Sequence, residues 1–193
     1  MTTRDIVHIA LFAALMAVLA FFPPLMIPAI GVPITAQSMG PMLAGGVLGA
    51  KRGGLSMLLF VALVAIGLPL LSGGRGGIGA LVGPWSGFIY GWVASAFVIG
   101  WLTERFWTNL TFVSAFAFAV IGGIGVVYGI GVPWFWWMSN ASAAAPTMSL
   151  GSAFIASALA FIPGDLIKAG VAAAVVVTVK RAYPLIAPRL ERV

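Results

Sequence analysis

The sequence has no cysteine, one histidine and few charged side chains. Of its 193 residues, 7% are charged and 62% are hydrophobic. Without cysteine there is no disulfide framework and no thiolate metal site, and His8 alone cannot form an imidazole cluster. Soluble domains carry about 25% charged residues, so this composition excludes a soluble enzyme. The high apolar content equally excludes disorder. We therefore expect a chain that is solvated by lipid.

Catalytic and nucleotide-binding motifs are also missing. The nearest match to a P-loop runs from Gly45 to Lys51, but Ala50 stands where the second glycine belongs and Arg52 replaces the hydroxyl residue. There is no Gly-x-Ser-x-Gly elbow and no His-Glu-x-x-His,. The chain is therefore not expected to hydrolyse ATP by a P-loop, or to be an enzyme at all.

The formal net charge of +6 comes from Lys and Arg residues that are spread along the chain. They separate apolar segments and form no basic helix face, so nucleic acid is not an expected partner. This spacing is typical of the loops of a polytopic membrane protein, whose cytoplasmic loops are enriched in Lys and Arg.

Six apolar segments approach the length of about 20 residues that a helix needs to cross a bilayer. Most end at Pro, Gly or a charged residue. They are roughly 6–22, 38–50, 55–71, 85–102, 112–131 and 163–181.

The Ala- and Ser-rich segment 140–161 is ambiguous: it suits a seventh span, a re-entrant piece or an interfacial lid. A seventh span would move the four C-terminal cations outside, against the usual orientation bias. Six spans with both termini in the cytoplasm place eight cations there. These are Arg4, Lys51, Arg52, Arg105, Lys180, Arg181, Arg189 and Arg192. We therefore predict one all-α membrane domain over residues 1–193, with six transmembrane helices and cytoplasmic termini.

Three charged residues do not fit this orientation pattern: Arg75, Asp165 and Lys168. A charge at the bilayer centre costs about 2.5–3.5 kcal/mol on insertion scales, so a charge that persists there is a functional candidate. Asp165 and Lys168 are three residues apart and share a helix face. They are either a mutually neutralised structural pair or part of a ligand site.

Small residues four apart allow membrane helices to approach closely. The glycines at 83, 87 and 91, and those at 125 and 129, predict packing inside the bundle. The first helix has a similar alanine stripe, which is either internal or a surface for a partner protein. It consists of Ala10, Ala13, Ala14 and Ala17.

An ordered set of motifs over nearly the whole chain resembles the BioY family, the biotin-binding S components of energy-coupling factor transporters. The set comprises Val32-Pro33-Ile34-Thr35-Ala36-Gln37, Met42-Leu43-Ala44-Gly45, Leu48-Gly49-Ala50-Lys51-Arg52-Gly53, Ile66-Gly67-Leu68-Pro69, Gly73-Gly74-Arg75-Gly76-Gly77, Gly83-Pro84 and Ile162-Pro163-Gly164-Asp165-Leu166-Ile167-Lys168. The aromatic run 134–137 matches none of these motifs.

The resemblance implies the six-helix S-component fold in a multi-pass protein of the prokaryotic inner membrane. It implies high-affinity capture of biotin at the outer face, with biotin as substrate and no cofactor or metal. The implied partners are a transmembrane coupling protein and a pair of ABC-type ATPases, and the alanine stripe of the first helix matches the family's docking spacing. The absence of a P-loop fits this arrangement, because the ATPases are separate chains.

The resemblance places ligand contacts at Asp165 and Lys168, and extends them to Arg75 in the glycine-rich loop and to Thr35 and Gln37 in the first loop. Asp165 can accept a hydrogen bond from a ureido N–H of biotin, Lys168 can donate to an oxygen, and the planar fork of Arg75 suits a carboxylate. Trp85 and Tyr90 are further candidates, as flanks for the ring system. Two other hypotheses stay open: a channel or facilitator for a small anion, with Arg75 at a pore, and a structural membrane protein with paired charges.

Overall fold

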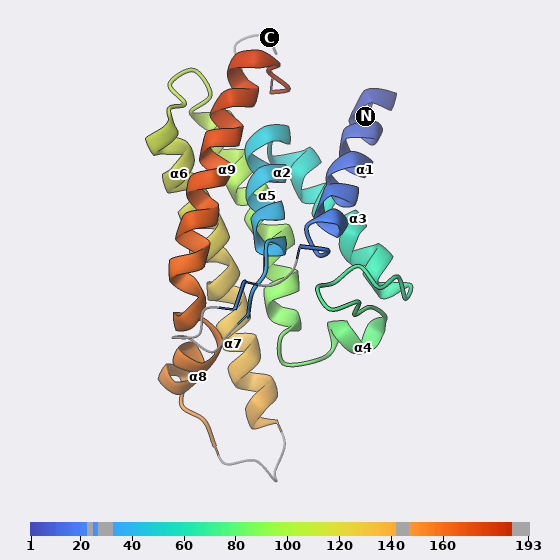
Figure 1. Ribbon diagram of the computed structural model, residues 1–193, viewed down its shortest axis with the longest axis vertical. Coiled ribbons are helices and arrows are strands. Elements are labelled where there is room, and N and C mark those ends of the chain that lie inside the picture. Colours follow the sequence, from blue (N-terminus) through green and yellow to red (C-terminus); the bar gives the residue numbers. More distant parts are fainter. Residues whose placement is uncertain (23–24, 27–32, 142–146, 187–193) are drawn as a thin grey trace.

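The computed structural model describes residues 1–22, 25–26, 33–141 and 147–186. It shows a helical bundle in which the start of α1 and the end of α9 lie at the same end (Figure 1). Helix α1 (Thr3–Val18) begins at a capping box, in which Thr2 and Asp5 satisfy each other's backbone N–H groups,. Cations 189 and 192, and the Pro-rich residues 23–24 and 27–32, lie outside the described residues.

The second predicted span is a short, interrupted element. Strands β1 (Leu25–Met26) and β2 (Pro33–Ile34) pair antiparallel, and η1 (Gln37–Met39) leads into α2 (Gly40–Leu48). All nine residues of α2 are buried, and the helix packs against α3, α5 and α9. At 1.5 Å per residue it is about 14 Å long, which is less than half the thickness of a bilayer core. The helix ends at Gly49, whose φ of +85° suits glycine,.

Helices α3 (Ala50–Ala65) and α5 (Ser86–Arg105) pack closely beside α2, with the short α4 (Ile78–Leu81) between them in sequence. A Cβ atom on Gly100 would lie 2.3 Å from the backbone nitrogen of Ala50, so the backbones meet only because this residue is glycine. The predicted internal role of the first glycine set is seen at Gly87 and Gly91. A Cβ there would lie 2.3 Å from Trp134 and 3.0 Å from Val127, respectively.

The fifth predicted span is longer than the sequence indicated. Helices α6 (Phe112–Val120) and α7 (Val127–Asn140) are joined by a π-helical segment, η2 (Ile121–Val126), and the helix continues through Pro133 instead of ending before it. Membrane helices tolerate Pro because neighbouring groups and local π adjustments satisfy the freed backbone. The two glycines of this element that were predicted to pack inside the bundle do not do so. Gly125 and Gly129 are exposed, and a Cβ on Gly129 would meet no described atom within 4 Å.

The ambiguous region 140–161 folds as the end of α7, helix α8 (Leu150–Ser157) and the 3-10 turn η3 (Leu159–Phe161). These elements lead directly into α9 (Ile162–Ala182), and α8 lies at the end away from the termini (Figure 1). Residues 142–146 of this region are outside the described part.

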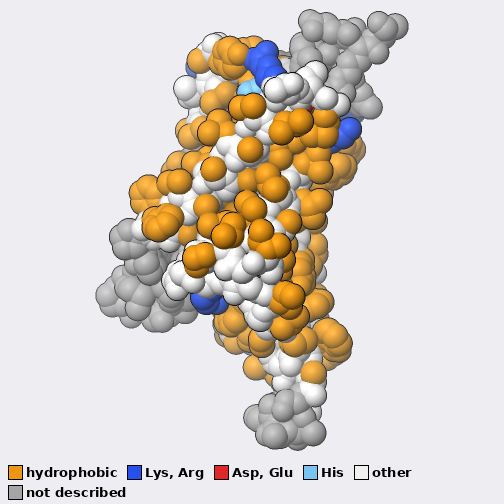
Figure 2. All heavy atoms as spheres, turned by 90° about the vertical axis from the view of Figure 1, so that its right-hand side faces the viewer, with side chains coloured by type: hydrophobic (Ala, Val, Ile, Leu, Met, Phe, Trp, Pro, Cys, Tyr) orange, Lys and Arg blue, Asp and Glu red, His pale blue; other side chains and the backbone are white. Residues whose placement is uncertain are grey.

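Three described helical stretches are long and apolar enough to cross a membrane: Ser86–Arg105, Phe112–Asn140 and Leu150–Ala182. Helices α1 and α3 have 16 residues each. Figure 2 shows hydrophobic side chains over most of one face, with Lys and Arg side chains near the upper end and at one place lower on the left edge. This distribution fits a protein surrounded by lipid.

Candidate functional site

The candidate site centres on Asp165, in the first turn of α9. Pro163 stands at the beginning of this helix, where no backbone donor is needed,. The carboxylate of Asp165 is 4% exposed and benefits from the positive end of the helix dipole,. At 1.5 Å per residue it lies about 25 Å from the end of α9, which is at the same end of the bundle as the start of α1,.

Lys168 lies one turn further along α9. Its Nζ is 2.8 Å from Oδ1 of Asp165, and both side chains are largely buried. The structure therefore brings together the two charged residues that the sequence placed on one helix face.

Two further residues complete the network, and the sequence did not single out either of them. Ser38, on η1, accepts a hydrogen bond from Lys168 at 2.8 Å and donates one to Oδ1 of Asp165 at 3.1 Å. Tyr128, on α7, donates from its hydroxyl to Oδ2 of the same carboxylate. Three elements that are far apart in sequence thus meet at Asp165.

An aromatic cluster extends from Tyr128 toward the end of the bundle away from the termini. The rings of Tyr128 and Phe88 are 6.0 Å apart, and those of Phe88 and Trp85 are 5.9 Å apart. Trp85 also contacts Phe135 at 4.9 Å and Phe161, just before α9, at 6.5 Å. Trp85 is 44% exposed. The cluster offers aromatic faces that suit a flat apolar ligand.

Gln37 precedes Ser38 and is 2% exposed, but its amide is committed to other parts of the protein. Its Nε2 donates to the carbonyl oxygens of Met16 and Leu70, and its Oε1 accepts from the backbone N–H and the hydroxyl of Ser72. In this arrangement Gln37 joins the end of α1 and the glycine-rich loop to the segment that carries Ser38.

Three more of the predicted ligand residues lie outside the Asp165 network. Arg75 is exposed, and its Nε donates to the carbonyl oxygen of Ser72 at 3.2 Å. Thr35 is half-buried between β2 and η1. Tyr90 donates from its hydroxyl to the carbonyl oxygen of Leu81, and its ring lies 5.3 Å from that of Trp134. None of these contacts joins Arg75, Thr35 or Tyr90 to Asp165.

The aromatic run that matched no motif supports the end of the bundle that carries α8. Trp134 donates from its indole N–H to the carbonyl oxygen of Gly83. Trp136 donates to the carbonyl oxygen of Met148, which also accepts from Asn140. The run therefore anchors the end of α7 to its neighbours.

The four alanines of α1 do not share one environment. Ala13 is 2% exposed and packs in the core with Met16. Ala10 and Ala14 are exposed, and Ala17 is half-buried. A partner that docks on the free face of α1 would therefore meet Ala10 and Ala14, whereas Ala13 faces the core.

Residues 1–185 match the model of the BioY family. The chain belongs to the BioY family. It is 46% identical to the biotin transporter BioY of Rhizobium etli, over 98% of this chain and the whole of that protein. It is also 46% identical to the biotin transporter BioY of Rhodobacter capsulatus, over 94% of this chain and 95% of that protein.

A solved structure described as the S component for biotin from an ECF-type ABC transporter has a similar fold. The TM-score is 0.80 at 33% identity, over 94% of this chain and 95% of that chain. The resemblance noted from the motifs is thus confirmed. These relatives are transporters and transporter components, and the prediction that the chain is not an enzyme is therefore confirmed.

Proposed function

We propose that this chain captures biotin at the outer face of a prokaryotic cell membrane and delivers it inward together with separate ATP-driven subunits. The observation that carries the proposal is the buried network of Asp165, Lys168, Ser38 and Tyr128, found in a chain whose family relatives are named biotin transporters.

The hydrogen-bond inventory of the network supports a ureido ligand. A carboxylate accepts about four hydrogen bonds and an ammonium donates three. Among the described residues, Asp165 accepts from Lys168, Ser38 and Tyr128, and Lys168 donates to Ser38 and Asp165. One acceptor position and one donor thus stay available. A ureido group offers a matching N–H and carbonyl oxygen, and the aromatic cluster suits the apolar ring.

The broken second element supports a binding site at this depth. Transporter sites are commonly built where a discontinuous helix starts inside the membrane. Here the chain passes from η1 into the short α2, and Ser38 of η1 contacts both charged residues of α9.

Biotin binding to site variants tests the proposal. Asp165→Asn presents a donor toward the ureido N–H, and Lys168→Met removes the charge but keeps most of the stem. A hydrogen bond to a charged group contributes about 1.5–3 kcal/mol, so each change should weaken affinity about tenfold to a hundredfold or more. Lys180→Met is the matched control, because Lys180 lies on the same helix but bonds to the carbonyl oxygens of Thr108 and Leu110. It should bind biotin normally.

The double variant separates the ligand site from a purely structural ion pair. If the pair only neutralises itself, each single variant should be unstable, and Asp165→Asn with Lys168→Met should recover both thermal stability and near-native binding. Recovery of affinity in the double variant would end the ligand hypothesis. A facilitator for small anions would show biotin flux through vesicles without saturable, tight retention of labelled biotin by the purified protein.

Delivery with an ATP-driven module is a separate part of the proposal. It is supported by the lack of a P-loop in the sequence and by the likeness to the solved S component for biotin from an ECF-type ABC transporter. Purification from the native membrane, followed by mass spectrometry, should recover a transmembrane coupling protein and ABC-type ATPases. Uptake should then depend on ATP.

A further inference from the structure

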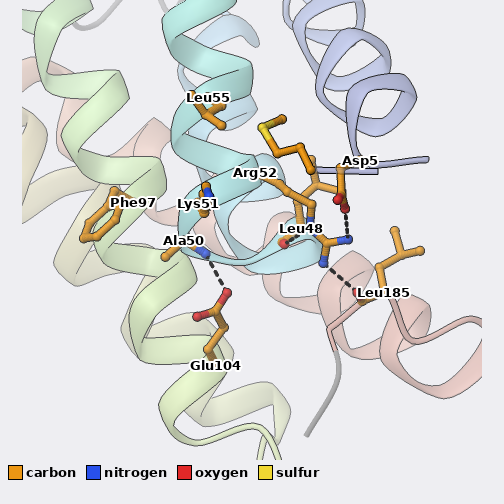
Figure 3. A pocket seen from close by; sticks show the side chains of 10 residues that line it. Asp5, Leu48, Ala50, Lys51, Arg52, Leu55, Phe97, Glu104 and Leu185 are labelled. Atoms are coloured by element: carbon orange, nitrogen blue, oxygen red, sulfur yellow. Dashed lines mark hydrogen bonds and ion pairs between the residues drawn. The ribbon is translucent and has the colours of Figure 1, made fainter. Parts of the chain in front are cut away.

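A cavity of about 400 Å³ opens at the end of the bundle that holds the termini, around the first turn of α3 (Figure 3). It lies at the other end of α2 from Ser38 of the Asp165 network, about 15 Å along that helix,. Its walls come from α1, α2, α3, α5 and the segment after α9. The lining residues are Met1, Asp5, Leu48, Ala50, Lys51, Arg52, Leu55, Phe97, Glu104 and Leu185.

One side of the cavity is apolar and continues onto the lipid-facing surface. Leu55 of α3 and Phe97 of the adjacent α5 line it, and Phe97 is 51% exposed. Leu58 lies one turn further along α3, toward the middle of the bundle, and is 52% exposed. A chain of methylene groups that lay along these residues would enter the cavity from the membrane.

The two carboxylates of the cavity are occupied by protein donors. Oε1 of Glu104 accepts from the backbone N–H of Ala50 at 3.0 Å, which caps the start of α3. Asp5 accepts from the backbone N–H of Thr2 at 2.8 Å and pairs with Arg52 at 3.4 Å. The charge of Asp5 is offset by its pairing with Arg52, whereas Glu104 keeps its negative charge and is offset only in part by the positive end of the α3 dipole against which it lies,.

The two cationic side chains of the cavity differ in how many hydrogen bonds and ion pairs they form with the protein. Arg52 bonds to Asp5 and to the carbonyl oxygens of Leu48 and Leu185, at 2.9 and 2.6 Å, and so holds three segments together. Lys51 is exposed, and none of the described carboxylates forms an ion pair with it. Its ammonium therefore adds to the positive end of the α3 dipole at the mouth of the cavity.

We infer that this cavity binds the headgroup of an anionic phospholipid. The phosphate lies at Lys51, and the acyl chains follow Leu55, Leu58 and Phe97. A cation at a pocket between membrane helices attracts an anionic headgroup, and Lys51 is the lining cation that pairs with none of the described carboxylates,. The apolar wall, continuous with the surface that lipid covers, identifies the source of the phosphate as a lipid and not a free anion. This site is independent of the biotin site.

Native mass spectrometry of the detergent-purified protein tests the inference by counting retained lipids. The probes are phosphatidylglycerol, phosphatidylcholine and inorganic phosphate. Phosphatidylglycerol should be retained over phosphatidylcholine, and Lys51→Gln should lower its occupancy about fivefold, the effect of one cation near an anionic headgroup. Lys51→Arg should keep it. Arg181→Gln is the matched control, because it removes an exposed cation that does not line the cavity.

A further variant and a second measurement complete the experiment. Phe97→Ala should lower lipid occupancy by removing the apolar wall, and biotin binding should be unchanged in all of these variants. Equal losses for Lys51→Gln and Arg181→Gln would reduce the effect to general attraction and overturn the site. Equal retention of the two lipids, or displacement of phosphatidylglycerol by millimolar inorganic phosphate, would also overturn it.

Discussion

A carboxylate inside an apolar bundle needs hydrogen bonds that water supplies elsewhere, and an unsatisfied buried charge is strongly unfavourable. Asp165 obtains them from a serine, a tyrosine and a lysine on three different elements. This arrangement fixes both oxygens of the carboxylate in space before any ligand arrives. Preorganisation of this kind favours binding because the ordering cost is met during folding.

At this scale we predict that Tyr128 acts through Asp165. Tyr128→Phe removes only the hydroxyl that donates to Oδ2. Because a hydrogen bond to a charged group contributes about 1.5–3 kcal/mol, biotin affinity should fall by up to about a hundredfold. The affinity of Asp165→Asn combined with Tyr128→Phe should be close to that of Asp165→Asn alone, since the two residues share one interaction.

The measurement is a double-mutant cycle on biotin affinity by calorimetry or equilibrium binding. Ser95→Ala is the control. Its hydroxyl is buried and has no hydrogen-bond partner among the described residues, so its removal should leave affinity unchanged. Additive losses for Asp165 and Tyr128 would show that the tyrosine contacts the ligand independently or acts on the fold as a whole.

The sequence was informative about charged residues and much less so about neutral polar ones. Asp165 and Lys168 stand out because charge is rare in a membrane segment. Ser38 and Tyr128 carry no such signal, since hydroxyl groups are common in membrane helices. Only the fold shows that they meet Asp165. Gln37 illustrates the reverse case, because its position in a family motif does not reveal that its amide bonds to the backbone of two other segments.

At the scale of the elements, the centre of the bundle depends on glycines at helix crossings. A Cβ on Gly100 would meet the backbone of Gly49 and Ala50, which cannot move as a flexible side chain can. Membrane helices pack through small residues because lipid provides no hydrophobic driving force between them. The end of the buried α2, at Gly49, is therefore held by a close backbone contact with α5.

We predict that Gly100→Ala lowers the thermal stability of the detergent-purified protein, by about 1–3 kcal/mol or more, because overpacking forces backbone shifts. Gly129→Ala is the matched control on α7, where the added methyl group meets no described atom within 4 Å. It should leave the melting temperature unchanged or raise it, since alanine favours the helix. Equal destabilisation by both changes would contradict the packing.

The free face of α1 yields a second prediction at this scale. Ala14→Leu should reduce energised uptake while leaving biotin binding by the isolated protein intact, because Ala14 is exposed and only a docked partner would meet it,. Ala13→Leu should instead lower thermal stability, since Ala13 is in the core. Ala62→Leu, at an exposed alanine of α3, is the control and should affect neither.

Uptake by cells that express the full transport system, set against biotin binding by the purified variants, separates these outcomes. Normal energised uptake in Ala14→Leu would remove this face of α1 from the docking surface. Loss of both binding and uptake in that variant would assign Ala14 to internal packing.

Helix positions followed from hydropathy, whereas helix ends did not. The start of α9 is an exception, because it was expected near Pro163 and the helix begins at Ile162. The fifth segment passed its expected end because a π segment and neighbouring helices accommodate Pro133, a context that the local sequence does not contain,. The length of α2 was overestimated, since an apolar segment that is buried in protein has the same hydropathy as one that faces lipid.

On the scale of the whole molecule, charge is polarised along the bundle. Arg52 pairs with Asp5 near the start of α1 and bonds to Leu185 after α9, and Lys180 bonds to the connection between α5 and α6. These contacts gather the described cations of the predicted cytoplasmic loops at one end. Arg75 lies in the loop between α3 and α4, which is away from that end (Figure 1). The positive-inside rule acts on such an asymmetry.

We predict that the cation-rich end faces the cytoplasm and that the Arg75 loop faces outward. Because the natural chain contains no cysteine, Lys51→Cys, Arg181→Cys and Arg75→Cys each introduce one thiol at an exposed position. In intact cells, a membrane-impermeant maleimide should label position 75 and leave positions 51 and 181 unlabelled, and all three should react after permeabilisation. Because α1 starts and α9 ends at the same end of the bundle, we expect an even number of crossings between them (Figure 1). Labelling of positions 51 and 75 together from outside would contradict six spans with cytoplasmic termini. Labelling of positions 51 and 181 without position 75 would show the opposite orientation, with the biotin site near the cytoplasmic face.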